Sequence, residues 1–333
     1  MRALTISLSC IATCLAVTCA NIVGADEIKW QIVTPFPDNT KPQKALTREA
    51  RKFSRTSEGR LNLQFVGTPV DTKTSVMQRF TTDPTISAAL IANFEYTQLV
   101  PDANLYSQTF AFNDAHEVDA IRLQIDIALV SRLQHDNFVV LGISGIGFAH
   151  LMSREKISGM NDFAGKTVWL PEAANLAAAS LSTYSLTLQS SDPDWRNFPA
   201  ASWPDLMLHA PIALIIDRSI PRFQFLLQPP IHYGYLLFIV KRSHWESLQA
   251  ADQKLIQAYV QSQLSGLEKN AKKMSVRAMK ILHNGGMKSI SLSRIDIDLI
   301  RRTGVDENIT PSLQALFQMA LDDFRRAADT LDK

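Results

Sequence analysis

The sequence has little cysteine, no dense run of one charge, and no long apolar segment after its first 25 residues. Its three cysteines are Cys10, Cys14 and Cys19, so the rest of the chain can form neither a disulfide nor a cysteine metal site. The 34 Lys/Arg and 32 Asp/Glu give a net charge of +2, which argues against electrostatic binding to nucleic acid. No later apolar run approaches the roughly 20 residues that span a bilayer.

What is present fits a folded protein. Hydrophobic residues make up 46% of the 333 residues and charged residues 20%, which excludes a disordered chain, a collagen and a polytopic membrane protein. At about 100–200 residues per domain, the length predicts two domains.

Residues 1–25 have the pattern of a secretory signal peptide. Arg2 supplies a positive start, residues 3–23 carry no charge, and Val23 and Ala25 suit cleavage before Asp26. We therefore expect a soluble, exported protein, most simply in a bacterial periplasm. An uncleaved anchor and a lipoprotein are the alternatives for this segment.

Catalytic signatures are broken or missing. Residues 142–146 approach a nucleophile elbow, but Ile146 stands where the second glycine belongs. No phosphate-binding fingerprint occurs, and the seven histidines never fall at HExxH spacing. The sequence therefore predicts no enzyme, no cofactor and no metal site. The alternative is an exported hydrolase that uses Ser144.

Strand and helix patterns alternate along the first half. We expect strands at 28–33, 61–66, 86–91 and 138–143. We expect a helix at 42–57, a short helix from a cap at Asp71 through Phe80, and a long helix from a capping box at Asp114 and Glu117 to His135. Such alternation predicts parallel sheets with helices on both faces.

The second half contains the longest periodic segment of the chain. We expect strands at 166–170, 213–217 and 235–241 and a helix at 173–184. Apolar residues then recur at steps of three and four from Leu255 to Leu282, until Gly285 and Gly286 end the pattern. A helix of this length would brace two domains, and Thr310 with Pro311 predicts the start of a last helix.

The order of these segments resembles the periplasmic solute-binding subunits of TRAP transporters, the DctP-like family. The resemblance covers nearly all of the chain after the signal peptide. It is carried by "IKWQIVTPFPDNT", "EGRLNLQFVG", "HEVDAIR", "NFVVLGISGIGFAHLMSREKISGMNDFAGKTVWLPEA", "ALIID", "YGYLLFIVKRSHWESLQAADQKLIQAYV" and "AMKILHNGGMKSI".

The resemblance implies an α/β, type II-like periplasmic binding protein fold, with two lobes braced by the long helix. One small solute would bind between the lobes, which close by hinge bending, and a membrane permease would receive it. By position, lobe one holds 26–146 with 233–268 returning to it. Lobe two holds 147–232, with 269–333 packing on it.

The chain departs from the family at the positions that bind carboxylates. Where members carry an arginine in a "GLKIRVP"-like strand, this chain has Trp169, and Ala149 replaces a second arginine. The turn at Asp217 and Arg218 is one residue shorter than the family's "VDGQENP". Without the arginine fork, we expect an apolar or amphipathic ligand. The change resembles a tryptophan-bearing branch associated with a tetratricopeptide-repeat lipoprotein partner.

The remaining site residues are predicted from their position at strand exits, where open α/β sheets bind ligands. They are Pro35, Asn93, Phe94, Tyr96, Phe148, Tyr233 and Tyr235. Core packing is the alternative for each aromatic residue, including Trp169. Arg218 could instead hold an organic acid.

Two functions therefore compete. The first is a solute receptor for a TRAP importer, and the second is a periplasmic lipid carrier that works without a permease. The sequence of one chain does not distinguish a receptor from a carrier of the same fold.

Overall fold

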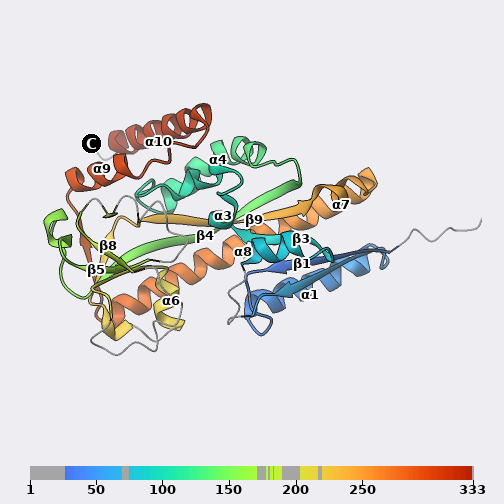
Figure 1. The fold of residues 1–333 in the computed structure, drawn as a ribbon, viewed down its shortest axis with the longest axis horizontal. Helices are drawn as coiled ribbons and strands as arrows, with labels where there is room; N and C mark the ends of the chain where they lie inside the picture. Colours follow the sequence, from blue (N-terminus) through green and yellow to red (C-terminus); the bar gives the residue numbers. More distant parts are fainter. Residues whose placement is uncertain are drawn as a thin grey trace, which may run out of the picture.

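The computed structural model describes residues 27–69, 75–170, 178, 181–182, 184–189, 203–216 and 220–331. The expected signal peptide, the Asp71 cap, most of the helix expected at 173–184, and Asp217 with Arg218 lie outside these residues. Within them, two α/β lobes lie side by side and share two long strands (Figure 1).

The sheet of the first lobe mixes parallel and antiparallel pairs. Strand β1 (Ile28–Thr34) pairs in parallel with β2 (Leu61–Gly67) and β3 (Ile86–Ala92). Strand β9 (His232–Lys241) then runs antiparallel to β3, and β4 (Phe138–Ser153) runs antiparallel to β9. All of β3 is buried, as expected for an apolar strand covered on both faces.

Helices cover both faces of this sheet. On one face, α1 (Lys41–Thr56) and the first half of α8 (Ala250–Asn284) close an apolar cluster. On the other face lie α2 (Val76–Thr82), α4 (Ala115–Arg132) and α10 (Pro311–Leu331). The short α3 (Asn93–Tyr96) and the 3₁₀ turn η1 (Pro101–Ser107) complete that second layer.

The second lobe is built on the far end of β4. There β4 pairs antiparallel with β7 (Leu206–His209) and β8 (Phe225–Gln228). Strand β5 (Thr167–Trp169) continues the sheet from β7 to β6 (Thr187–Gln189), and β10 (Lys288–Ser291) pairs with β8. Helix α9 (Arg294–Thr303) packs its Ile300 into one apolar cluster of this lobe, and α6 (Pro211–Ile216) packs its Leu214 into another. The remaining short helices are η2 (Met160–Phe163), η5 (Ile220–Arg222) and α7 (Arg242–Glu246).

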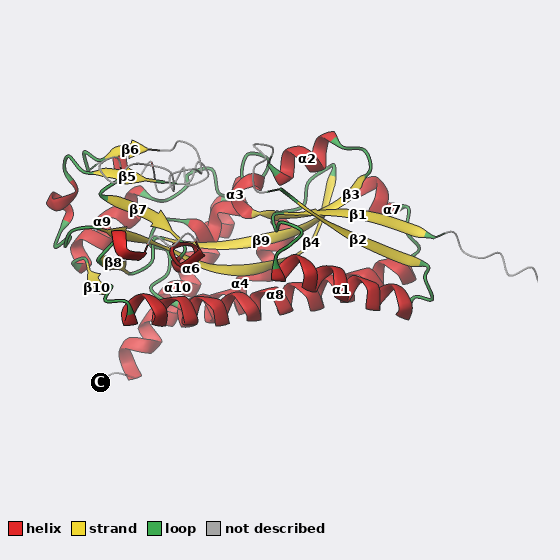
Figure 2. Ribbon diagram, turned by 90° about the horizontal axis from the view of Figure 1, so that it is seen from below, coloured by secondary structure: helices red, strands yellow, loops and turns green. Residues whose placement is uncertain are grey.

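Helix α8 joins the two lobes. Its 35 residues correspond to about 52 Å at 1.5 Å per residue. Ile256 and Leu264 enter the cluster of the first lobe, whereas Leu282 enters a cluster of the second. Figure 2 shows the helix running beneath both. Gly285 follows as its C-cap, so the predicted bracing helix and its end are confirmed. No helix among the described residues is long and apolar enough to cross a membrane.

Three sequence predictions were wrong. The central strands β4 and β9 are antiparallel, because periodicity reports which face a strand buries and not its direction. Residues 211–216 form a helix and not the strand expected at 213–217, since Pro211 suits a first helical turn. Helix α2 begins after Ser75, whose side chain accepts a hydrogen bond from the Gln78 amide, so its cap is not Asp71.

The segment expected on lobe two divides between the lobes. Helix α9 contributes to a cluster of the second lobe, whereas α10 packs along α4 and places Leu313 and Phe317 in the first. The lobe boundaries at 146, 232 and 268 stay predictions.

Candidate functional site

The two shared strands cross between the lobes at an irregular point. The register of β4 against β9 shifts between Gly145 and Gly147, and Gly147 has a φ of +103°, a conformation that favours glycine. A Cβ atom at Gly145 would overlap the Tyr233 hydroxyl. The strands can therefore bulge and approach closely here because neither position carries a side chain.

Beyond this bulge, aromatic rings from four strands lie together. Phe148 and Tyr233 are a cross-strand pair whose ring centroids are 5.2 Å apart. His150 pairs with His209 on β7, and the rings of His209 and Trp169 on β5 are 5.6 Å apart. We call these five residues the aromatic wall.

Both histidines of the wall are held in the neutral form. Burial lowers the pKa of His150 and of His209 to about 4, because an imidazolium loses its hydration there without gaining an anionic partner. The Nδ1 atom of His150 lies 3.3 Å from the Leu227 carbonyl oxygen. At neutral pH the wall therefore combines apolar surface with uncharged polar groups.

Several residues predicted from the sequence meet here. Phe148, Trp169 and Tyr233 belong to the wall, and Ala149 lies between Phe148 and His150, paired with His232. Trp169 is only 7% exposed and packs in a cluster with Met207, Leu214 and Phe223. The packing alternative for Trp169 is therefore realised in this conformation, beside its contact with His209.

Other predicted residues bind within the core of the first lobe. The hydroxyls of Tyr96 and Tyr235 donate to the carbonyl oxygens of Leu133 and Ala103. Asn93 is buried; its Nδ2 donates to the same Ala103 oxygen and its Oδ1 accepts from the Tyr235 amide. These contacts are structural, and a ligand role for the three residues stays a prediction.

Of the last four predicted positions, the structure describes only Pro35 and Phe94. Pro35 is half-buried directly after β1, and Phe94, in α3, is 42% exposed. Asp217 and Arg218 lie outside the described residues. The structure thus brings only part of the predicted set together.

Three histidines near these residues were not among the predicted site residues. His150, His209 and His232 lie on three separate strands, and their positions form no sequence motif. His232 is the most unusual, because its Nε2 atom is buried and has no hydrogen-bond partner among the described residues. Its Nδ1 lies 2.5 Å from the Ser107 carbonyl oxygen, and burial lowers its pKa to about 4. Only strand register could have placed it beside Ala149.

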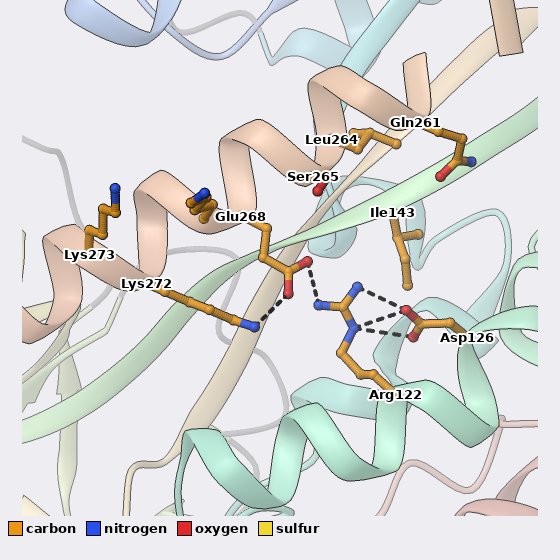
Figure 3. Close-up of a pocket in the computed structure, with 10 residues that line it drawn as sticks. Arg122, Asp126, Ile143, Gln261, Leu264, Ser265, Glu268, Lys272 and Lys273 are labelled. Carbon is orange, nitrogen blue, oxygen red and sulfur yellow. Dashed lines mark hydrogen bonds and ion pairs between the residues drawn. The ribbon is translucent and has the colours of Figure 1, made fainter. Parts of the chain in front are cut away.

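A second feature is a charged hollow between α4 and α8, with a volume of about 540 Å³ (Figure 3). Arg122 reaches across it from α4, with its Nη1 2.7 Å from Glu268 Oε2 and its Nη2 2.9 Å from Asp126 Oδ2. Lys272 adds an ion pair of 3.0 Å to the other Glu268 oxygen. The hollow is also lined by Ile143, Gln261, Leu264, Ser265, Lys269 and Lys273.

Glu268 ties the hollow to the strand bulge. It accepts a hydrogen bond of 3.1 Å from the Gly145 amide, while Arg122 donates to the Tyr233 hydroxyl. Burial raises the pKa of Glu268, but Arg122 and the Gly145 amide outweigh it and leave the pKa below its ordinary value. The ionised network thus fastens α4, α8 and β4 together at one point.

Neither site has the donors of a metal centre. No group of three or more His, Cys, Asp or Glu side chains among the described residues could hold a metal ion.

Comparison with known proteins places the fold. No known protein-family profile matches the chain, and no curated protein matches it. A TRAP periplasmic solute-binding protein from Ochrobactrum anthropi, with its C-terminus bound in the ligand-binding pocket, superposes with a TM-score of 0.78 at 14% identity. The match covers 92% of this chain and 99% of that one.

Two ligand-bound structures are also similar. One is a TRAP periplasmic solute-binding protein from Ralstonia eutropha H16 with bound (S)-2-acetolactate, with a TM-score of 0.73 and 16% identity over 89% of this chain and 99% of that one. The other is the Bordetella pertussis extracytoplasmic solute receptor DctP7 binding pyroglutamic acid, with a TM-score of 0.73 and 12% identity over the same shares of the two chains. The chain therefore has the two-lobed α/β fold of the TRAP periplasmic solute-binding proteins.

Proposed function

We propose that this protein is an extracytoplasmic solute receptor that captures one small molecule between its lobes and delivers it to a TRAP-type membrane permease. Its fold, with two lobes joined by strands and one long helix, supports this role. The N-terminal segment expected to be a signal peptide supports a periplasmic location. The protein would act by binding alone, without catalysis.

The aromatic wall is the observation that supports the choice of ligand. By the family resemblance, Ala149 and Trp169 stand where a carboxylate-binding relative carries arginines. Three described titratable groups near them, His150, His209 and His232, are neutral. A buried carboxylate without a cationic partner is strongly destabilised. The favoured ligand is therefore apolar or amphipathic, with an uncharged polar group that an imidazole can bind.

Binding of an organic acid is the second candidate. The similar structures from Ralstonia eutropha and Bordetella pertussis hold (S)-2-acetolactate and pyroglutamic acid, and Arg218 could supply the cation that the wall lacks. A lipid carrier that works without a permease is the third candidate. A tetratricopeptide-repeat lipoprotein as a further partner stays a prediction from the resemblance.

Thermal denaturation with two ligand panels tests the proposal. A ligand that binds only the folded state raises the melting temperature. We expect neutral amphiphiles such as fatty alcohols and acyl esters to raise it at pH 7, and succinate, pyroglutamate and acetolactate to leave it unchanged. Stabilisation by the acids alone would reject the apolar ligand and favour the second candidate.

A further inference from the structure

Exposed cations are concentrated in two segments of the molecule, α1 and the second half of α8. Residues 41–60 contain seven Lys/Arg and two Glu, and residues 269–288 contain six Lys/Arg and no Asp or Glu, although the whole chain has a net charge of only +2. The rest of the molecule is therefore net acidic. The sequence shows no dense basic run in these segments because the cations are spaced by about one helical turn.

Helix geometry points both sets away from the core. In α8, Lys269, Lys273, Arg277 and Lys280 lie on the side opposite Val260, Leu264 and Ala278, which are buried. In α1, the buried residues Leu46 and Ala50 likewise lie opposite the cations. The cations form a set of eight exposed residues without an ion pair among the described residues, namely Lys41, Lys44, Arg51, Arg55, Lys269, Lys273, Arg277 and Lys280. We call this set the basic face.

The two helices present these cations in the same direction. Both pack on one side of the first lobe's sheet, where Phe53 of α1 stacks on Tyr259 of α8 at 4.4 Å, and Figure 2 shows them along the same edge of the molecule. The basic face therefore extends over both lobes, on the side formed by α1 and α8.

We propose that the basic face docks on an anionic bilayer surface. The cations are spread along two helices and are not gathered in a pocket, which matches a flat anionic surface better than a compact acidic epitope. Exposed apolar side chains stand among them on α8, with Val276 71% and Ile281 47% exposed, as on helices that lie at a membrane interface. This docking does not depend on the ligand between the lobes.

Vesicle co-sedimentation of the mature protein tests the proposal. The probes are phosphatidylcholine vesicles with and without phosphatidylglycerol, at low and at physiological ionic strength. We expect binding only to the anionic vesicles, weakened by salt because screening shortens the reach of the charges to about 8 Å. Lack of binding to anionic vesicles at low salt contradicts the proposal.

A matched pair of variants assigns the binding to the face. Each Lys or Arg near an anionic surface strengthens binding several-fold, so Lys269→Glu/Lys273→Glu/Arg277→Glu should lower vesicle binding at least about tenfold. The control Arg132→Glu/Lys156→Glu/Arg302→Glu changes the net charge equally at exposed positions outside α1 and α8, and should retain most of the binding.

If the two variants lose vesicle binding equally, net charge alone explains the binding, and the proposal is overturned. Binding to native membranes but not to the lipid vesicles would also overturn it, and would assign the face to an acidic protein. Ligand-induced thermal stabilisation is a separate readout, and the charge variants should leave it intact.

Discussion

The charged hollow and the aromatic wall lie next to the same bulge of β4 against β9, but their buried polar groups are in opposite charge states. In the hollow, Arg122 and Lys272 are ion-paired to carboxylates. In the wall, His150 and His209 are neutral and have no anionic partner among the described residues. Arg122 and Lys272 can thus stay charged in the hollow because each has a carboxylate partner, whereas the five side chains of the wall are uncharged at neutral pH.

We expect this difference to separate a structural role from a binding role. Glu268 has its acceptor capacity occupied by Arg122, Lys272 and the Gly145 amide, so the hollow fastens the lobes' shared elements. Under the proposed function, the wall supplies rings and imidazoles to a neutral ligand. Changing one region at a time should separate the two roles.

The largest effect is expected from Arg122→Ala. The substitution leaves Asp126 and Glu268 partly buried and without their main cation, so the free energy of unfolding should fall by about 3 kcal/mol. Urea denaturation at pH 7 measures it. Arg48→Ala removes an exposed ion pair to Glu49, and this control should cost less than about 1 kcal/mol. Similar losses in the two variants would mean that the hollow network adds no special stability.

Lowering the pH should decrease the free energy of unfolding, because the wall contains two buried histidines. The folded-state pKa values of His150 and His209, about 4, lie below the ordinary histidine value of 6.5. Their contribution is therefore fully present above pH 6.5 and is lost as the pH falls towards 4. Between pH 7 and 5, we expect a loss on the order of 1–2 kcal/mol per histidine.

Urea denaturation across this pH range checks the sign. His150→Gln/His209→Gln should have a flatter pH profile than the unchanged protein. An equally steep profile in the variant would place the dependence elsewhere.

A smaller effect is expected where the strands bulge. The Cβ atom of Gly145→Ala would overlap the Tyr233 hydroxyl, so we expect a destabilisation of about 1.5 kcal/mol from overpacking. Adding Tyr233→Phe removes the overlapping oxygen and should recover part of the loss. A double-mutant cycle with additive effects would show that the two positions do not meet.

The smallest expected effect is a gain of acid binding at Ala149, whose side chain lies on the face of β4 opposite Phe148 and His150. Ala149→Arg introduces the cation that the family resemblance associates with carboxylates, and should let pyroglutamate or succinate raise the melting temperature by about 2–4 °C. Ala149→Leu adds bulk without charge and should show no such response. If the two variants behave alike, residue 149 does not face the ligand.

Local signals in the sequence placed most regular elements correctly. Asp114 accepts hydrogen bonds from the His116 and Glu117 amides at the start of α4, where a cap was predicted. The last helix begins at Pro311 as expected, although the Thr310 hydroxyl donates to Asp102. Such features depend on neighbours within a few residues, which a sequence displays directly.

The composition of the candidate site could not be predicted from local sequence signals. His150, His209 and His232 come together only through the pairing of β4 with β7 and β9. Tyr96 lies in α3 directly after β3, but Tyr235 lies within β9 and not at a strand exit. The hydroxyls of both bind backbone carbonyls in the core. Side-chain direction and strand register, which decide both cases, are set by tertiary packing.

Native mass spectrometry of the mature protein, from Asp26 onward, tests the central claim most directly. Solvent extraction would then identify any bound molecule, and Trp169→Arg would serve as the comparison. We predict a bound lipid or other uncharged amphiphile that is lost in the variant. A bound organic acid in the unchanged protein would contradict the account of the wall, while leaving the two-lobed receptor fold in place.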